Sequence, residues 1–225
     1  MNARILDVEQ VTHDVKRFLT EKPQGYKYTP GKATDVAINK PGWQYKQRPF
    51  TFTSLNSDPN LEFIIKTYPL SEFPKHKGVS EEMHKLDVGD ELKLGEPWGT
   101  INYNNPGVFI AGGAGITPFI AIFRHLAKDG GLKGNKLIFS NKTKNDVILE
   151  QELRKYFSKD DLILTLTREN VVNYENSKID RDFLQKHISD FNSSFYICGP
   201  KMMVGDLKKI LSSLGASVDS IVFEK

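Results

Sequence analysis

The chain has 225 residues, of which 39% are hydrophobic and 26% charged, ordinary values for a soluble globular protein with a packed core. This composition excludes disordered and fibrous classes, and the length suits two domains of about 100 to 120 residues each. The net charge of +3 comes from 31 basic and 28 acidic residues that are mixed along the chain. Because there is no basic block, we expect no nucleic-acid partner.

The sequence has no apolar run near the ~18 residues of a membrane span, and its first residues alternate between polar and apolar. We therefore expect a cytoplasmic protein with no membrane partner. The single cysteine, Cys198, can form no intramolecular disulfide and cannot hold a four-cysteine zinc or iron–sulfur site. No metal site is expected, so redox chemistry would use a bound organic cofactor.

The first hundred residues are typical of a closed antiparallel sheet, because short strand-like segments recur between Gly, Pro and Asn about every ten residues. The expected strands are residues 4–12, 32–38, 49–54, 61–68 and 91–94. Residues 80–86 have helical spacing, with Val79, Met83 and Leu86 on one face. The pattern predicts an antiparallel Greek-key β-barrel with one helix over residues 1–104.

From Pro106 onward, apolar strand-like runs alternate with segments of helical period. The expected strands are residues 108–111, 137–139, 162–166, 195–198 and 221–223. This alternation is the signature of a parallel sheet with crossover helices. Residues 105–225 are therefore predicted to form an α/β domain with a five-stranded parallel sheet.

A glycine-rich turn follows the first of these strands and includes Gly113, Gly115, Thr117 and Pro118. Glycines let the backbone approach a ligand, and we expect Thr117 as the N-cap and Pro118 as the first residue of the next helix. The N-terminus of that helix could bind a phosphate. Glycine also serves purely conformational needs in tight turns. Because Pro118 replaces the third glycine, the usual Rossmann fingerprint is not met.

Four short motifs together resemble the ferredoxin-NADP reductase superfamily and occur in that family's order. They are R-x-[YF]-[ST] at Arg48–Thr51, a phosphate turn at Gly78, Val79 and Ser80, G-x-G-x-x-P at Gly113–Pro118, and C-G-P at Cys198, Gly199 and Pro200. The resemblance implies an FAD-binding barrel and an NAD(P)-binding α/β domain.

The resemblance assigns the barrel residues to FAD. Arg48 would pair with the pyrophosphate, Phe50 would pack on the flavin, and Thr51 would reach flavin N5. Gly78, Val79 and Ser80 would bind the pyrophosphate, and the remaining candidate cofactor contacts on the barrel are Ile65 and Lys66. Phenylalanine at position 50 lacks the hydroxyl of the commoner tyrosine.

The same resemblance assigns Gly113, Gly115, Thr117 and Pro118 to the nicotinamide dinucleotide. Cys198 would lie near nicotinamide C4 and flavin N5, with Gly199 and Pro200 beside it. Thr51 and Cys198 are therefore the candidate catalytic residues.

The choice of dinucleotide depends on two loops. Residues 140–144 contain no acid that could bind a ribose 2′-hydroxyl. Thr167, Arg168 and Glu169 resemble the family's S-R-E sequence, whose arginine grips the 2′-phosphate of NADP, and Lys178 falls where many members have a second basic residue. We expect NADP(H) to be preferred over NAD(H).

By resemblance, electrons pass from NADPH, or NADH, through FAD to a separate flavodoxin or ferredoxin, and we expect a monomer. One alternative is the reductase component of a multicomponent oxygenase. Another is a non-catalytic flavin- and nucleotide-binding electron-transfer subunit, and FMN could replace FAD.

Two segments depart from the family pattern. The family's G-P-x-G is replaced by Glu96-Pro97-Trp98-Gly99, and the usual C-terminal aromatic residue is missing because the sequence ends in Glu224 and Lys225. Unless Phe223 replaces that ring or the chain is truncated, we expect an accessible flavin face and oxidase activity toward oxygen.

Overall fold

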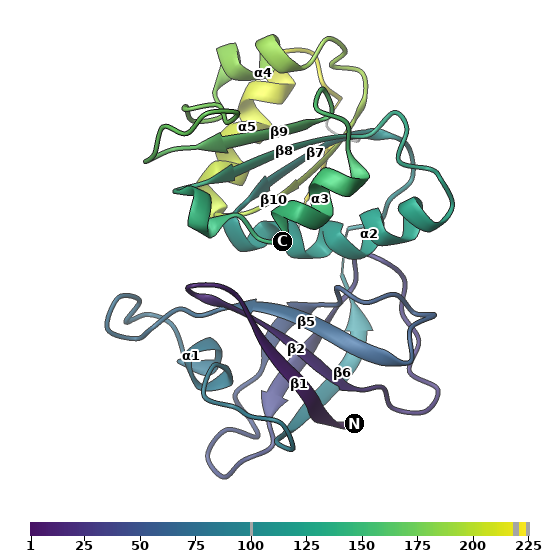
Figure 1. Ribbon diagram of the computed structural model, residues 1–225, viewed down its shortest axis with the longest axis vertical. Coiled ribbons are helices and arrows are strands. Elements are labelled where there is room, and N and C mark those ends of the chain that lie inside the picture. Colours follow the sequence, from purple (N-terminus) through teal and green to yellow (C-terminus); the bar gives the residue numbers. More distant parts are fainter. Residues whose placement is uncertain (100, 218–220, 224–225) are drawn as a thin grey trace. The chain divides into compact units, whose positions relative to one another are not determined.

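The computed structural model describes residues 1–99, 101–217 and 221–223. The chain divides into two compact units, Met1–Gly99 and Thr100–Lys225, each built on its own sheet (Figure 1). The expected fold class, an antiparallel barrel followed by a five-stranded parallel α/β sheet, is confirmed. The boundary expected from the sequence falls between Asn104 and Asn105. Both residues donate their backbone N–H groups to Tyr196 Oη at 3.2 Å, and both belong to the second unit.

Six antiparallel strands form the sheet of the first unit, in the order β4-β3-β6-β1-β2-β5. They are β1 (Asn2–Thr12), β2 (Val15–Glu21), β3 (Ala33–Ile38), β4 (Arg48–Thr51), β5 (Asn60–Lys66) and β6 (Glu91–Trp98). After β3, β4 and β5, the chain returns as β6 beside β3, which is the Greek-key connection.

The sheet closes into a barrel just beyond the end of β4. Phe52 bridges to Phe63 of β5, and the Thr53 N–H donates to the carbonyl of Glu62 at 2.9 Å. The Thr53 hydroxyl also donates to Glu62 Oε1 at 2.7 Å. Phe18, Phe52 and Phe63 are fully buried in the enclosed core. Closure removes the exposed edges that an open antiparallel sheet would have.

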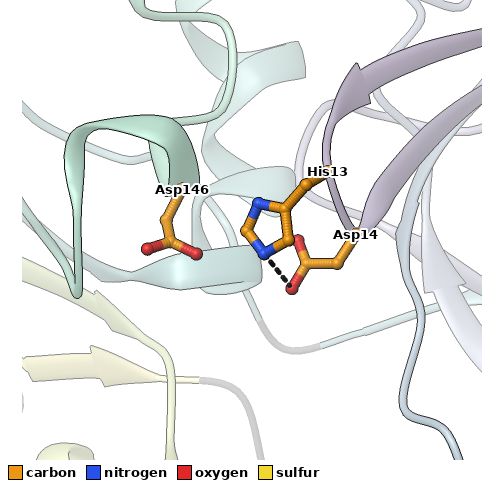
Figure 2. Close-up of side chains that lie close together, drawn as sticks. All are labelled: His13, Asp14 and Asp146. Atoms are coloured by element: carbon orange, nitrogen blue, oxygen red, sulfur yellow. Dashed lines mark ion pairs between the residues drawn. The ribbon is translucent and has the colours of Figure 1, made fainter.

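Strand β2 was missed by the sequence analysis. Its buried apolar residues, Val15 and Phe18, are three residues apart and separated by Lys16 and Arg17, so the sequence lacks the alternation that predicts a strand. The turn before it is only His13 and Asp14 and contains no glycine. His13 Nε2 lies 3.5 Å from Asp14 Oδ2 (Figure 2).

Helix α1 (Val79–Met83) is shorter than the 80–86 helix expected from the sequence. Val79, Met83 and Leu86 are nevertheless all buried in the barrel core, as their spacing indicated. The apolar face of this short helix therefore packs into the barrel core.

The second unit contains five parallel strands in the order β11-β10-β7-β8-β9. They are β7 (Gly107–Gly112), β8 (Lys136–Asn141), β9 (Leu162–Leu166), β10 (Ser194–Cys198) and β11 (Ile221–Phe223). From β7 the chain first adds β8 and β9 on one side, and then places β10 and β11 on the other. The order thus reverses between β7 and β10, where doubly wound sheets bind ligands.

Helices cover both faces of this sheet. They are α2 (Thr117–Lys128), α3 (Glu150–Tyr156), α4 (Arg181–His187) and α5 (Lys201–Ser213). Phe119 and Phe123 of α2 pack on Phe109 of β7, and α3 lies on the same side (Figure 1). Side chains of α4 and α5 share the other hydrophobic cluster with β7, β8 and β10. None of the helices in the described ranges is long and apolar enough to cross a membrane.

Candidate cofactor and nucleotide sites

Two loops of the second unit meet at the point where the strand order reverses. One loop joins β7 to α2 and the other joins β10 to α5. A Cβ atom added to Gly115 would lie 2.4 Å from the Cys198 carbonyl oxygen, and one added to Gly112 would lie 2.7 Å from Met203 Sδ. The two motifs that are far apart in the sequence, G-x-G-x-x-P and C-G-P, therefore pack directly against each other.

This packing explains why residue 115 is a glycine, even without a bound ligand. It does not explain why residue 113 is also a glycine. Gly113 has a φ of +53°, and a Cβ added there would meet nothing within 4 Å. Its backbone conformation is one that glycine adopts at little cost. Gly113 is therefore the position in this turn where a ligand could lie against the backbone.

The expected role of Thr117 as N-cap is wrong. A short 3₁₀ turn, Gly113–Ile116, runs directly into α2, so Thr117 is already helical, with φ −57° and ψ −42°. Its hydroxyl donates to the Ala114 carbonyl at 3.0 Å and makes no cap bond. Pro118 lies in the first turn of α2, where its missing N–H has no intrahelical acceptor.

Cys198 is buried at the end of β10, in register with Ala111 of β7. Gly199 and exposed Pro200 lead into α5, whose first turn carries no acid. The expected nicotinamide residues thus lie at the carboxyl end of β10, beside the glycine turn.

The loops after β8 and β9 extend the sheet beyond its strands. Thr167 and Arg168 donate backbone N–H groups to the carbonyls of Asn141 and Lys142, both at 2.9 Å. These bonds hold Arg168 at the carboxyl edge of the sheet with its side chain exposed. The chain returns beside β9 because Thr165 Oγ1 donates to the Ser177 carbonyl at 2.6 Å, and exposed Lys178 follows.

In the barrel, three of the candidate FAD residues, Arg48, Phe50 and Thr51, lie on β4, at one end of the strand order. Ladder pairing within the described ranges joins Arg48–Thr51 to β3, whereas contact with β5 begins at the Phe52–Phe63 bridge. Arg48 and Phe50 are half-buried, and Thr51 is buried. The Arg48 guanidinium has no ion-pair or hydrogen-bond partner among the described residues, so its donors are available to a ligand.

The Gly78 turn lies beside a residue that sequence reasoning did not identify. Gly78 has a φ of +74°, and a Cβ there would lie 3.1 Å from Leu70 Cδ1 and 3.6 Å from Trp43. Ser80 Oγ accepts the Tyr68 N–H at 3.2 Å. Trp43 lies in a Pro-Gly loop shortly before the strand that begins at Arg48. This closeness in the sequence is the only signal that could have pointed to Trp43 as a candidate site residue.

Ile65 and Lys66 have other partners in the barrel. The Ile65 side chain is buried in the core, and its carbonyl lies 2.8 Å from His84 Nε2. Burial lowers the pKa of His84, although the hydrogen bond to Ile65 opposes this. The Lys66 ammonium is paired with Asp14, so Lys66 would have to break that pair to contact a cofactor.

Comparisons with known proteins agree with this arrangement. Residues 1–112 match the family described as "FAD-binding domain", and residues 109–209 match "Oxidoreductase NAD-binding domain". Together with the fold and the four motifs, these matches show that the chain belongs to the ferredoxin-NADP reductase superfamily.

The similar proteins include reductases of different systems. The reductase component of propane 2-monooxygenase from Rhodococcus jostii (strain RHA1) is 27% identical over 242 residues, which cover 100% of this chain but only 63% of that protein. NADH-cytochrome b5 reductase 2 of Mycosarcoma maydis is 26% identical, covering 96% of this chain and 69% of that protein.

A solved structure shows the same fold. The flavohem-like FAD/NAD-binding domain of nitric oxide dioxygenase from Vibrio cholerae O1 biovar El Tor has a TM-score of 0.85 and 21% identity, covering 99% of this chain and 97% of that one.

Proposed function

We propose that this protein transfers electrons from a reduced nicotinamide dinucleotide, through bound FAD, to a separate redox protein. The observation that carries this proposal is the packing of the Gly113–Pro118 turn on the Cys198–Pro200 turn at the switch point of the second sheet. Switch points are where doubly wound sheets bind nucleotides. The open space at Gly113 fits a dinucleotide, and the unpartnered guanidinium of Arg48 fits the pyrophosphate of FAD.

The residues of the chain would bind and orient. Arg48 would offer the pyrophosphate a planar fork of charge-assisted donors, and the Phe50 ring would provide an apolar surface for the flavin. When bound, the flavin accepts a hydride and returns single electrons. Thr51 and Cys198 would position the reacting rings, and the protein contributes orientation and electrostatics without a general acid.

For the electron donor we propose NADH. Arg168 and Lys178 made NADPH the expectation from the sequence, but the similar Mycosarcoma maydis protein is named for NADH. Comparing kcat/KM for the two donors tests this choice. A clear NADPH preference that is lost in an Arg168→Ala variant would restore the original expectation.

For the electron acceptor we propose a separate protein, because the chain is similar along its whole length to a protein named as the reductase component of a monooxygenase. Flavodoxin or ferredoxin was the first expectation. Likeness along the whole chain to an oxygenase reductase component favours an oxygenase as the acceptor. Likeness to cytochrome b5 reductases makes cytochrome b5 a further candidate acceptor. Reduction rates with each kind of acceptor would rank them.

Purification tests the proposal as a whole. We expect a yellow protein that bleaches on addition of NADH, and chromatography of the released chromophore should identify FAD and not FMN. A colourless protein that takes up no flavin would refute the proposal and favour the non-catalytic binding subunit.

The expectation of an accessible flavin face concerns the C-terminal residues of the sequence. The backbone of Phe223 belongs to β11, but Glu224 and Lys225 lie outside the described residues.

A further inference from the structure

Two side chains hold the segment that leaves β5. The carbonyl of Ile65 lies 2.8 Å from His84 Nε2, and because a carbonyl oxygen can only accept, this imidazole nitrogen carries the hydrogen. Further along the segment, the Leu70 N–H donates to Glu81 Oε2 at 2.9 Å. Glu81 belongs to α1 and His84 directly follows that helix. Both ends of residues 65–70 are therefore fixed to the short helix that comes after them in the chain.

Between these two contacts lies a hydroxyl group whose hydrogen is free. The Tyr68 N–H donates to Ser80 Oγ at 3.2 Å. A hydroxyl oxygen that accepts a hydrogen bond can still donate its own hydrogen. That hydrogen has no acceptor among the residues that the structure describes, and Ser80 is only half-buried. The backbone of Tyr68 therefore holds the Ser80 hydroxyl in place and leaves it able to donate to a ligand.

The same segment packs on the Gly78 turn. β5 ends before residues 68–70, and no strand pairing extends through them within the described ranges. A Cβ atom added to Gly78 would lie 3.1 Å from Leu70 Cδ1, so the turn and this side chain are in close contact. Loss of the Glu81 bond would therefore release the Leu70 backbone, and with it the nearby N–H that holds the Ser80 hydroxyl.

We infer that Glu81 and His84 are positioning residues for FAD, because together they hold residues 65–70 so that the Ser80 hydroxyl stays in place with its hydrogen available to the pyrophosphate. This inference rests on the proposed binding of FAD by the first unit, in which Gly78 and Ser80 are candidate pyrophosphate contacts. Neither Glu81 nor His84 belongs to the four motifs of the superfamily, and neither has to touch the cofactor. Each acts through Ser80 by fixing one end of the segment that contacts it.

The rate at which FAD leaves the full-length, flavin-loaded protein tests this inference. After dilution, released FAD is followed by the rise in fluorescence of free flavin. For Glu81→Ala and for His84→Ala, we expect release about three- to tenfold faster than in the wild type. This is the scale expected when one hydrogen bond to a charged group is weakened but not removed.

Conservative variants show whether the two hydrogen bonds are responsible. Glu81→Gln keeps an oxygen that can accept the same N–H, and His84→Gln keeps an N–H that can donate to the same carbonyl, so both should release FAD at close to the wild-type rate. Glu82→Ala is a matched control, because it removes a carboxylate from the same helix that accepts from Lys85 at 3.0 Å and not from residues 65–70. Its release rate should be unchanged.

A comparison of double variants shows whether Glu81 and His84 act through Ser80. Ser80→Ala removes the hydroxyl and should itself speed the release of FAD. Adding Glu81→Ala or His84→Ala to Ser80→Ala should then change the rate by less than about twofold, because the group that they position is gone. A merely structural role would give the same factor with and without the hydroxyl.

The outcomes are distinct. An unchanged release rate in either alanine variant would overturn the inference for that residue, and so would equal factors with and without the Ser80 hydroxyl. Losses in the glutamine variants as large as those in the alanine variants, or a loss in Glu82→Ala, would also overturn it. Far-UV circular dichroism checks that each variant is folded, and either alanine variant decides the test if the other does not fold.

Failure of this inference can be told apart from failure of the proposed function. Wild-type protein that takes up no FAD would refute the proposed function itself. FAD that binds to the wild type and leaves at a rate that neither Glu81 nor His84 influences would remove only the positioning role.

Discussion

The backbone of Gly115 lies directly against the carbonyl group of Cys198, and a Cβ atom at Gly115 would come within 2.4 Å of that oxygen. Real Cβ atoms do not approach a backbone oxygen so closely, so one of the two loops would have to move. The nearest atoms are all backbone, belonging to Cys198 and Gly199, and cannot rotate away as a side chain could. This contact links the two halves of the candidate nucleotide site.

Gly115→Ala should therefore disrupt nucleotide binding while leaving the barrel intact. We expect FAD content to stay near normal, kcat/KM for NADH to fall at least about a hundredfold, the scale of a small misplacement of a reacting group, and Tm to fall. Stopped-flow reduction and flavin absorbance measure the two effects. Gly205→Ala is a matched control, because a Cβ there meets nothing within 4 Å and alanine favours the α5 helix; a similar loss in that control would contradict the packing argument.

Arg48→Ala should weaken FAD binding. Hydrogen bonds to charged groups contribute about 1.5 to 3 kcal/mol each, so we expect the Kd for FAD to rise by one to two orders of magnitude. Arg48→Lys should recover only part of this loss, because an ammonium group lacks the planar fork of donors. Fluorescence titration of the apoprotein with FAD measures both variants. Arg4→Ala, at an exposed position of β1, should bind FAD normally.

The Thr53–Glu62 pair at the barrel closure should stabilise the first unit. Thr53→Val keeps the shape of the side chain but removes the hydroxyl that donates to Glu62 Oε1 at 2.7 Å. Both residues are buried, so the free energy of unfolding should fall by about 1 to 3 kcal/mol because a buried carboxylate oxygen loses a hydrogen bond. Urea denaturation followed by far-UV circular dichroism measures this change. Thr53→Ser retains the hydroxyl and should lose clearly less stability; equal losses would show that the hydrogen bond is not responsible.

Stability should decrease in mildly acidic solution because of two histidines. Burial lowers the pKa of His84 and of His187 relative to the ordinary value. In the unfolded chain both would titrate near about 6.5, so below that pH the unfolded chain binds more protons than the folded one. The stability from these groups is complete above about pH 6.5 and is lost as pH falls toward their folded pKa values.

Measuring Tm between pH 8 and pH 5 checks this expectation. His84→Gln should flatten part of the decline, and the double variant His84→Gln/His187→Gln should flatten more. An unchanged decline in the double variant would assign the acid sensitivity to other groups.

Much of this protein follows from local sequence patterns. Apolar runs such as residues 108–111, separated by helical segments, indicated the parallel sheet because a strand buried on both faces must be apolar throughout. The spacing of Val79, Met83 and Leu86 likewise indicated the buried side of α1 and of the residues that follow it. The order of four short motifs was sufficient to indicate the superfamily.

Other features depend on contacts between distant segments. Strand β2 was missed because Lys16 and Arg17 interrupt its apolar pattern, and its place in the sheet depends on pairing with β1 and β5. Thr117 was misassigned because the 3₁₀ turn before it comes from the packing of the glycine loop. A single-sequence pattern contains no information about either contact.

The sequence by itself therefore determined the two sheets, the superfamily and the residue types available for FAD and a dinucleotide, because these depend on periodicity and short motifs. Only the tertiary structure decided that Gly115 packs on Cys198, that Lys66 is paired with Asp14, and that the Glu169 carboxylate accepts the Lys144 N–H. Each of these contacts joins residues well separated along the chain, so its existence depends on how the strands are ordered and not on the residues that flank it.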